Sequence, residues 1–454
     1  MQPLLFAHLH FLFTNDKNVV MIKMTFSHLN LMQHAPGSSA MPDATTIRPN
    51  ATEAFDPQAR ARALRPLLAR HAERCEQDGR ITDEVFDALR EAELFAITAP
   101  LRAGGPGAKL ITHIETVAEL AKGCVGTAWA YSLLSSVTAS VKAMPPPVRE
   151  QVLRNGDELF CSVAAQTGFA DPAADGNYRI SGKWGFASGC RHANWALNGI
   201  AIRDAAGQVV DGGFALIDLG QPQVQILDNW QVAGMSGSGS NMIAVDNLVV
   251  PETLLLRASR RPPAEALLAM PGLEPRDRWP TEPLFPLIVL PPMLGAACAM
   301  LESVVQTMEK RPVVWWSYPS QKDSQRLVGA AGQAALEIDS AWLHVRRAAA
   351  MLDETAQHRL LTGFEKARIQ ADCGYAMGLL RDAGNRLMDI AGPGAFALGS
   401  PLQRFWRDLN VGTRHNAMNQ GLSIELYGRA LLGLDSSLSL LADIGPVPEW
   451  AAPR

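Results

Sequence analysis

Apolar residues at helical spacing predict that the ordered structure begins with helices. Asp56-Pro57 is the pair expected at an N-cap and a first helical position, and apolar residues follow at every third or fourth place. A second amphipathic helix follows, capped by Thr82 or Asp83. Over residues 111–142 the helical pattern is nearly continuous and apolar on most sides, which is typical of a buried helix.

The pattern changes from about Glu158, where short β-rich runs replace the helical spacing. The runs recur every ten to fifteen residues or so and are bounded by Gly, Asp, Asn or Pro. They read LFCSVAA, YRISGKWGFA, WALNGIAIR, GGFALIDL, VQILDNWQV and NMIAVDNLVV. This spacing predicts a compact all-β domain, a barrel or a sandwich, that closes at Pro251.

Helical spacing returns from about Pro283 to the end and predicts a four-helix bundle. The four long segments are 287–311, 323–352, 361–391 and 401–434. We therefore expect a mostly α-helical protein with a central β domain. Its parts would be an N-terminal helical domain at 51–156, the β domain at 157–258 and the bundle at 259–454.

Residues 1–50 differ in composition from the rest, and we interpret them as a disordered extension without assigned function. Translation of the natural protein could begin at Met1, Met24 or Met41. The glycine-rich segments AGGPGA and GMSGSGSN do not match a dinucleotide-binding or phosphate-binding loop, and no βαβ alternation surrounds them. We therefore expect no site for NAD or ATP.

Composition excludes several kinds of partner. The net charge of −4 and the absence of a basic stripe argue against nucleic acid and anionic membrane surfaces. No apolar run looks long enough to span a bilayer, and no signal peptide is recognisable. Six cysteines lie far apart, which argues against a disulfide framework or a metal site and for the reducing cytoplasm. A small neutral or aromatic substrate fits this chain better.

Five segments between residues 56 and about 440 together resemble the acyl-CoA dehydrogenase fold, and within it the two-component flavin-dependent monooxygenases. The segments are LRPLLARHAERCEQDGRITDEVFDALREAELFAITAP with the following GG, GCVGTAWAYSLL, YRISGKWGFASGCRHANW, NWQVAGMSGSGSNMIAVDNLVVPE and RFWRDLNVGTRH. Members of this family act on phenols, secosteroid phenols and dibenzothiophene, and some oxygenate amino sugars. The resemblance implies a cytoplasmic homo-oligomer, a tetramer or dimer.

The same resemblance implies the cofactors and the reaction. The chain would receive FMNH2 or FADH2 from a separate NAD(P)H:flavin reductase and react it with O2. A C4a-(hydro)peroxyflavin would then hydroxylate or otherwise oxygenate a small aromatic or polycyclic substrate. An acyl-CoA dehydrogenase-like oxidoreductase and a non-catalytic relative of the fold are the alternatives.

The resemblance assigns the chemistry to His415 and Ser188. Dehydrogenases of this fold bring a Tyr-Glu pair to the substrate, and counting from Arg407-Asp408 places these positions at His415 and Asn416. Asparagine cannot act as the general base that removes the α-proton. Another group of dehydrogenases has its glutamate where Phe285 stands, and Glu282 nearby keeps the dehydrogenase alternative open.

In the monooxygenases a histidine like His415 lies beside flavin and substrate, where it could donate to the peroxide or accept a phenolic proton. A serine like Ser188 helps to hold the peroxide. The resemblance also implies cofactor-binding residues, although ordinary core strands and a helix C-cap would explain the same pattern. These residues are Trp184, Phe186 and Ser188 beside the flavin ring, Ala165, Gln166 and Thr167 at its other edge, and Arg311, Gly392 and Gly394 on a neighbouring subunit.

Substrate contacts are expected from Trp129, Tyr131 and Asn416. At helical spacing the two aromatic residues fit a plain helix core equally well. Many aromatic hydroxylases of the family carry a second histidine on this helix, and the matching position here is Val137. This departure argues against a simple phenol as the substrate.

Overall fold

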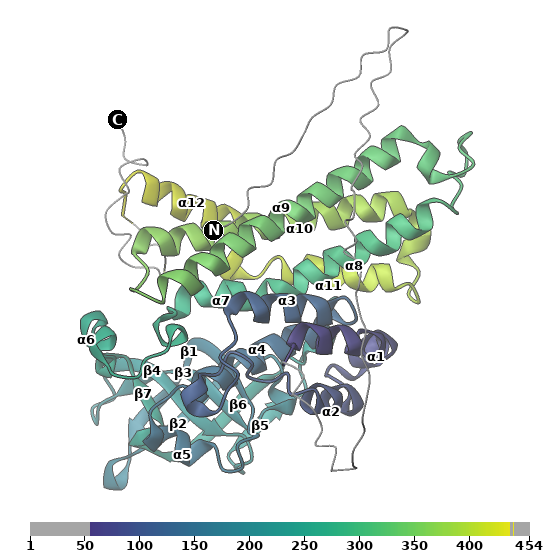
Figure 1. The fold of residues 1–454 in the computed structure, drawn as a ribbon. Coiled ribbons are helices and arrows are strands. Elements are labelled where there is room, and N and C mark those ends of the chain that lie inside the picture. Colours follow the sequence, from purple (N-terminus) through teal and green to yellow (C-terminus); the bar gives the residue numbers. More distant parts are fainter. Residues whose placement is uncertain (1–54, 436–438, 440–454) are drawn as a thin grey trace, which may run out of the picture. The chain divides into compact units, whose positions relative to one another are not determined.

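Asp56 is the N-cap of the first helix, as predicted, because its carboxylate accepts the backbone N–H groups of Gln58 and Ala59 at 3.0 Å. The computed structural model describes residues 55–435 and Ser439, so the extension predicted at 1–50 lies outside the described residues. Thr82 takes the N-cap position of the second helix without a side-chain cap hydrogen bond. The N-terminal helices are α1 (Pro57–Asp78), α2 (Asp83–Glu91), α3 (Leu110–Ala121), α4 (Val125–Lys142) and α5 (Pro146–Val152), with a 3-10 turn η1 (Leu101–Ala103) (Figure 1).

The continuous helix predicted over 111–142 is wrong, because the chain breaks between α3 and α4. Gly123 lies at the break against the backbone of α1, where a Cβ atom would come within 2.7 Å of the Leu68 side chain. The close approach of α1 therefore requires glycine here and turns the chain into a new helix. In Figure 1, α4 lies between the sheet and helices α3 and α8 (Pro291–Met308).

Helix α4 is buried on nearly all sides, as its apolar pattern predicted. Before its last residue, only Leu133, Val137 and Ser140 are partly exposed rather than buried. Their spacing of four and three residues places them on one face of the helix. We call this face the α4 strip. Leu133 packs against the bundle core and Val137 against a core on the side of the sheet, so the strip follows the seam between them.

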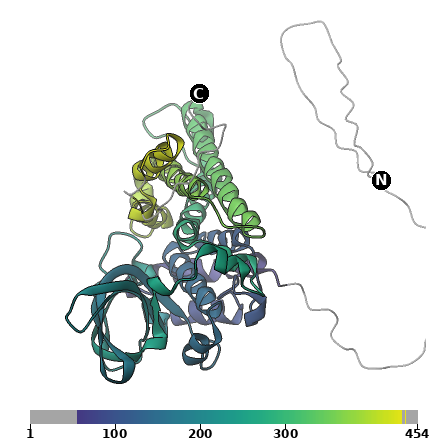
Figure 2. The ribbon, with the colours of Figure 1, turned by 90° about the vertical axis from the view of Figure 1, so that its left-hand side faces the viewer.

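Seven strands form one mixed sheet, which curves into the barrel-like ring seen in Figure 2. The strand order is β5-β6-β2-β1-β3-β4-β7, and of these neighbours only β1 and β3 are parallel. Pro251 ends β6 as predicted, but a further short strand follows it. The strands are β1 (Phe160–Pro172), β2 (Asn177–Trp184), β3 (Trp195–Arg203), β4 (Val209–Asp218), β5 (Val224–Leu227), β6 (Met242–Pro251) and β7 (Leu255–Arg257).

The C-terminal helices differ from the predicted bundle at the fourth segment. The prediction of a single helix over 401–434 is wrong, because one helix ends at Gly412 and a second begins at Gln420. His415 and Asn419 each turn a side chain back onto the following backbone as an N-cap, which stabilises the interruption. The other helices here are α6 (Ala264–Ala269), α7 (Thr281–Val289), α9 (Gln325–Thr355), α10 (Gly363–Ala391), α11 (Pro401–Gly412) and α12 (Gln420–Leu431), with 3-10 turns η7 (Pro275–Arg278) and η10 (Asn416–Met418).

The apolar core runs from α3 through α7 and α8 into α9, α10 and α11. Thr281–Met308, which covers α7 and α8, is long and apolar enough to cross a membrane by length and composition, so the expectation that no such run exists is wrong. However, 78% of its most apolar window is buried inside the fold, as in a core helix. The division into three domains at 51–156, 157–258 and 259–454 stays a prediction.

Candidate active site

His415 lies in the interruption between α11 and α12, between two aromatic side chains. Its ring centroid is 6.0 Å from that of Trp129 on α4 and 5.5 Å from that of Phe285 on α7. The three residues come from distant parts of the chain, and the break in the predicted fourth helix is what places His415 among them. The predicted catalytic histidine and one predicted substrate contact are therefore brought together.

The hydrogen bonding of His415 fixes which ring nitrogen is free. Nδ1 accepts the backbone N–H of Ala417 at 3.2 Å, so a neutral ring carries its proton on Nε2. Burial lowers the pKa of His415 below its usual value, which favours this neutral form near pH 7. The site therefore presents an N–H donor between two aromatic rings.

Ser188 lies beside this group at the end of a chain of buried hydroxyl groups. The indole Nε1 of Trp129 donates to Ser188 Oγ at 3.1 Å, Ser188 Oγ is 2.7 Å from Ser240 Oγ, and Ser240 Oγ is 2.7 Å from Ser238 Oγ. We call these four residues the serine chain. An indole N–H can only donate, so Ser188 accepts from Trp129 and its own proton goes to Ser240 or to a ligand.

Close to Ser188, the aromatic side chain of Phe186 lies on the surface of the protein. Phe186 is 75% exposed although it is a large apolar residue, and its backbone is left-handed with φ +63°. Its ring meets that of Trp230 edge-on at 5.6 Å. Exposure and backbone strain together in a residue two places from Ser188 are features of ligand-binding sites rather than of cores.

Strand β1 supplies a second exposed edge through a bulge. Between Val163 and Gly168, five steps along β1 oppose two steps along β3 from Asn198 to Ile200, and residues 164–167 between them are exposed. The predicted contacts Ala165, Gln166 and Thr167 lie in this bulge. These three residues have no partner in the register of β1 with β2 or β3 and are exposed, so the bulge can contact a ligand.

Two predicted site residues lie in cores instead. Trp184 is fully buried in the sheet core, where its Nε1 donates to Gly199 O at 2.8 Å. Tyr131 is fully buried among the N-terminal helices, donates to Leu94 O at 2.7 Å, and has its pKa raised by burial. The structure does not bring either side chain to His415. Asn416 follows His415 directly but is exposed.

Asp408 has a role that the sequence analysis did not assign. Its carboxylate accepts the backbone N–H of Met235 at 2.5 Å, and Arg407 donates to Ala233 O at 2.7 Å. Burial raises the pKa of Asp408 to about 7. This Arg-Asp pair holds the loop that leads into the serine chain. A buried carboxylate beside a glycine-rich loop gives no distinctive signal in a single sequence.

Arg311 and the turn at residues 391–394 form a second group, at the far end of α8. Arg311 Nη1 donates to Ala391 O at 3.1 Å, directly before Gly392, which has φ +70°. Phe285 precedes α8 and Arg311 follows it, and a helix of 18 residues spans about 27 Å. One chain therefore does not bring Arg311, Gly392 and Gly394 to the group around His415.

Among residues 55–435, the His415 ring forms no ion pair with a carboxylate. Its Nδ1 bonds the Ala417 N–H, and the aromatic rings beside it are those of Trp129 and Phe285. Phe285 occupies one of the positions where dehydrogenases of this fold have their base. Glu282 lies in the first turn of α7, one turn before Phe285, with no recorded ion pair in the described structure. Phe285 itself, and not a carboxylate, is the α7 residue whose side chain lies against the His415 ring.

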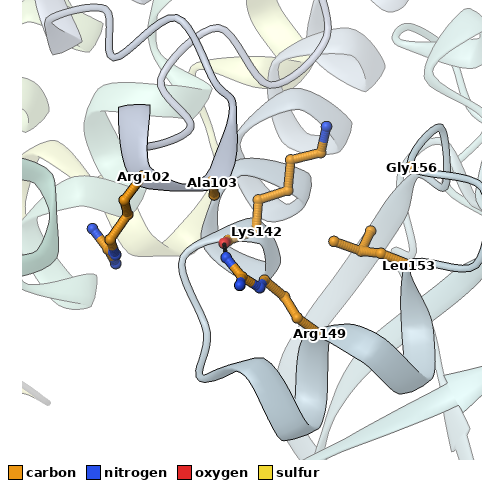
Figure 3. A pocket seen from close by; sticks show the side chains of 6 residues that line it. All are labelled: Arg102, Ala103, Lys142, Arg149, Leu153 and Gly156. Carbon is orange, nitrogen blue, oxygen red and sulfur yellow. Dashed lines mark hydrogen bonds between the residues drawn. The ribbon is translucent and has the colours of Figure 1, made fainter.

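A separate surface recess of about 290 Å³ lies at the C-terminal end of α4 (Figure 3). Arg102, Lys142 and Arg149 line it together with Ala103, Leu153 and Gly156. Arg149 Nη1 lies 3.5 Å from Lys142 O, so its guanidinium is turned toward the end of α4. None of these residues belongs to the predicted site.

Known proteins resemble the chain over most of its length. Profiles of the acyl-CoA dehydrogenase N-terminal and C-terminal domains match residues 50–149 and 287–420. The oxygenase subunit HsaA of a flavin-dependent monooxygenase from Rhodococcus jostii is 30% identical over 382 residues, covering 82% of this chain and 97% of HsaA. The oxygenase component of p-hydroxyphenylacetate 3-hydroxylase from Acinetobacter baumannii is 28% identical, covering 82% of this chain and 87% of that protein.

Solved structures agree with these relatives. XiaF from Streptomyces sp., in complex with FADH2 and glycerol, superposes with a TM-score of 0.79 at 29% identity, over 84% of this chain and 96% of XiaF. The fold and these similarities confirm the predicted family. The chain belongs to the flavin-dependent monooxygenases of acyl-CoA dehydrogenase fold, as the oxygenase component of a two-component system.

Proposed function

We propose that this oxygenase component inserts oxygen into a small aromatic or polycyclic substrate, with His415 and Ser188 as the residues that act on the reacting atoms. Bound reduced flavin supplies the activation of O2 and the transfer of one oxygen atom. The relatives named for p-hydroxyphenylacetate and resorcinol support an aromatic substrate. The observation that carries the proposal is the neutral imidazole of His415 between Trp129 and Phe285, where a dehydrogenase needs a carboxylate.

His415 acts as a hydrogen-bond donor in this proposal. Its Nδ1 is engaged by Ala417, so Nε2 carries the proton and can donate to an oxygen atom beside the flavin. Accepting a phenolic proton at Nε2 would first require the ring to change tautomer and lose the Ala417 contact. The geometry therefore favours donation over the alternative role as a base.

Ser188 positions the reactive edge of the flavin. Ser188 already accepts from Trp129, and if Ser240 donates to it as well, its own proton is free for a flavin atom. Phe186 and Trp230 would cover one face of the ring, and the bulge at Ala165, Gln166 and Thr167 would line its edge. These aromatic walls keep water from the reacting atoms.

A second copy of the chain completes the cofactor site in this proposal. Arg311, Gly392 and Gly394 lie too far along α8 to reach the flavin of their own chain. The hairpin after Arg311 carries three exposed apolar residues, Val314, Trp315 and Trp316, at 71%, 98% and 72% exposure. Their exposure supports burial against a partner subunit, as a dimer or tetramer.

The reduced flavin comes from a separate NAD(P)H:flavin reductase, and we place the reaction in the cytoplasm. All six cysteines are free thiols, which suits a reducing compartment. The relatives named as oxygenase components support the separate reductase. FADH2 is the first cofactor to test, because XiaF was solved with it, and FMNH2 is the second.

Oxygen labelling tests the proposed reaction. The chain is mixed with a flavin reductase, NADH, FAD and a panel of phenols and fused-ring aromatics under ¹⁸O₂. We expect one labelled oxygen atom in the product, and none when the label is in the water. The absence of any oxygenated product, together with bleaching of bound oxidised flavin by an acyl-CoA, would show a dehydrogenase instead.

A further inference from the structure

Unsatisfied polar atoms gather in one short segment before α7. Seven buried side-chain nitrogen atoms have no hydrogen-bond partner in the described structure, and three of them lie within residues 276–279. They are Arg276 Nε, Arg278 Nε and Trp279 Nε1. Buried polar groups in folded proteins are nearly always hydrogen-bonded, so such a concentration marks a place where a ligand or water completes the bonding.

Arg276 holds the centre of this segment in a defined position. Its Nη1 donates to Ala139 O on α4 at 2.5 Å, and its guanidinium carbon lies 5.6 Å from the centroid of the Trp279 ring. The free N–H groups of Arg276 and Trp279 therefore belong to one stacked pair. Burial lowers the pKa of Arg276 to about 10, so it stays charged near pH 7.

The carboxylates nearest in sequence are bonded to another cation. Asp277 and Glu274 pair with Arg102 at 2.5 and 3.4 Å, and no ion pair is recorded for Arg276 in residues 55–435. They offset part of its charge from a distance but leave its Nε without an acceptor. A buried cation without a hydrogen-bonded counter-ion is unfavourable, which is why a bound anion would be stabilised here.

This segment lies along the same helix as the proposed oxygenation site. Ten residues of α4 separate Trp129, beside His415, from Ala139, which binds Arg276, and this corresponds to about 15 Å. The α4 strip of Leu133, Val137 and Ser140 is the least buried face of the helix over this length. An apolar body lying along the strip would reach from one place to the other.

His113 adds a neutral acceptor near Arg276. Its Nε2 is 3.0 Å from Ser132 Oγ, which itself donates to Ile288 O, so Nε2 carries the proton and Nδ1 is left as a buried lone pair. Burial and the charge of Arg276 lower the pKa of His113 to about 4. The imidazole therefore stays neutral near pH 7 and does not compete for an anion.

The surface beside this segment is also basic. Lys142 lies one turn beyond Ala139 and, with Arg149, lines the recess in Figure 3. Neither has a recorded ion pair within the described ranges, whereas Arg102 in the same recess is paired with Asp277. Like charges around a recess raise the local concentration of anions. An anionic molecule would therefore be attracted to this end of α4.

We infer that the substrate carries an acidic group, such as a carboxylate, which the N–H groups of Arg276 and Trp279 bind while the oxygenated ring lies beside Trp129 and His415. The position of the oxygenated end rests on the proposed function. The anion site itself rests only on the segment at residues 276–279. The substrate class is an elongated aromatic acid whose apolar body covers the α4 strip.

A pair of matched ligands tests this inference without turnover. 4′-Hydroxybiphenyl-4-carboxylate and its neutral 4-carboxamide are titrated by calorimetry into the protein loaded with oxidised FAD. We expect the carboxylate to bind on the order of ten-fold more tightly, as for a hydrogen-bonded charged group. Arg276→Gln should remove this preference, whereas Arg276→Lys should keep part of it. Arg154→Gln, at an exposed arginine paired with Asp218, should keep all of it.

Equal affinity of the two ligands for the wild-type protein, or no binding of either, would overturn the inference. So would a preference that persists in Arg276→Gln. If that variant does not fold, the wild-type comparison and Arg276→Lys still decide the question. Because nothing is oxygenated in these titrations, a failure of the proposed monooxygenase reaction would appear in the labelling experiment and not here.

Discussion

Helix α4 borders two buried polar groups that differ in how completely they are hydrogen-bonded. At one end, every member of the serine chain has a partner within 3.1 Å, from Trp129 through Ser188 to Ser240 and Ser238. At the other end, Arg276 and Trp279 each keep a buried nitrogen atom without a partner in the described structure. The same helix thus supports one saturated and one unsaturated group.

The difference separates two kinds of function. A saturated network holds its members in fixed positions and specifies the local structure. An unsaturated group is less stable alone and gains more when a ligand binds. The serine chain is therefore suited to position the reactive edge of the flavin, and the Arg276 segment is suited to recognise the substrate. His415 belongs with the first group through Trp129, yet its Nε2 proton is available for oxygen.

The largest effect is expected for His415→Ala, which removes the donor next to the saturated group. Loss of one aligned donor lowers rates about 100-fold. We expect product formation to fall by this factor while H2O2 release rises and flavin affinity stays the same. The measurement is product formed per O2 consumed, with FAD affinity determined separately by fluorescence.

His415→Asn is the matched control for that variant. Asparagine can cap η10 as His415 does and offers an amide N–H, so coupling should fall less than in His415→Ala. If His415→Ala forms less product per O2 consumed only because η10 unfolds, His415→Asn, which keeps the cap, should form as much product per O2 as the wild-type protein. If His415→Ala forms as much product per O2 consumed as the wild-type protein, His415 does not act in the site and is not its hydrogen-bond donor.

An intermediate effect is expected at Asp408, which holds the loop before the serine chain. Asp408→Ala leaves the buried N–H of Met235 without an acceptor, so we expect the free energy of unfolding to fall by about 2 kcal/mol. Asp408→Asn keeps an acceptor oxygen and should cost less. Urea unfolding at pH 6 measures both variants, and equal losses would show that the hydrogen bond is not the cause.

The raised pKa of Asp408 also predicts a dependence on pH. Its folded pKa of about 7 lies above the ordinary value of 3.8, so the stability it contributes is present below about pH 4 and is lost as the pH rises through 7. Asp408→Asn cannot titrate. Between pH 5 and 8 the wild-type protein should therefore lose stability relative to Asp408→Asn, and parallel curves would contradict the assigned pKa.

The sequence predicted the fold and the family correctly because long periodic segments and an ordered set of motifs carry that information, whereas the role of His415 stays a prediction. It did not predict the break in the fourth helix, since residues 413–419 contain no proline and no glycine to mark it. Local caps at His415 and Asn419 and the packing around them decide it instead. The break brings the His415 ring against α4 and α7, and the proposed function depends on this position.

The direction in which side chains point was the other feature that the sequence did not predict. Trp129 and Tyr131 are two residues apart on α4, or about 200° around the helix, so they cannot line the same pocket. Trp184 and Phe186 would share one face of a continuous strand, but β2 ends at Trp184 and Phe186 has left-handed backbone. In a helix that is apolar on all sides, and at the end of a strand, the sequence pattern does not show which residue faces a ligand.

The smallest effects are expected when the stability of one variant in the serine chain is compared with that of one variant in the Arg276 segment. Ser240→Ala removes the middle of the saturated chain and leaves two hydroxyl groups short of a partner, so we expect it to lower the free energy of unfolding by about 1 kcal/mol. Arg276→Met removes a buried charge that has one hydrogen bond, and a methionine can keep part of the packing on Trp279. Without ligand, its stability should therefore stay within about 0.5 kcal/mol of the wild-type protein.

Urea unfolding of both variants at pH 7 makes the comparison. If Arg276→Met loses as much stability as Ser240→Ala, the guanidinium is needed to hold α4 and η7 together, and the contrast between a positioning group and a recognition group does not hold.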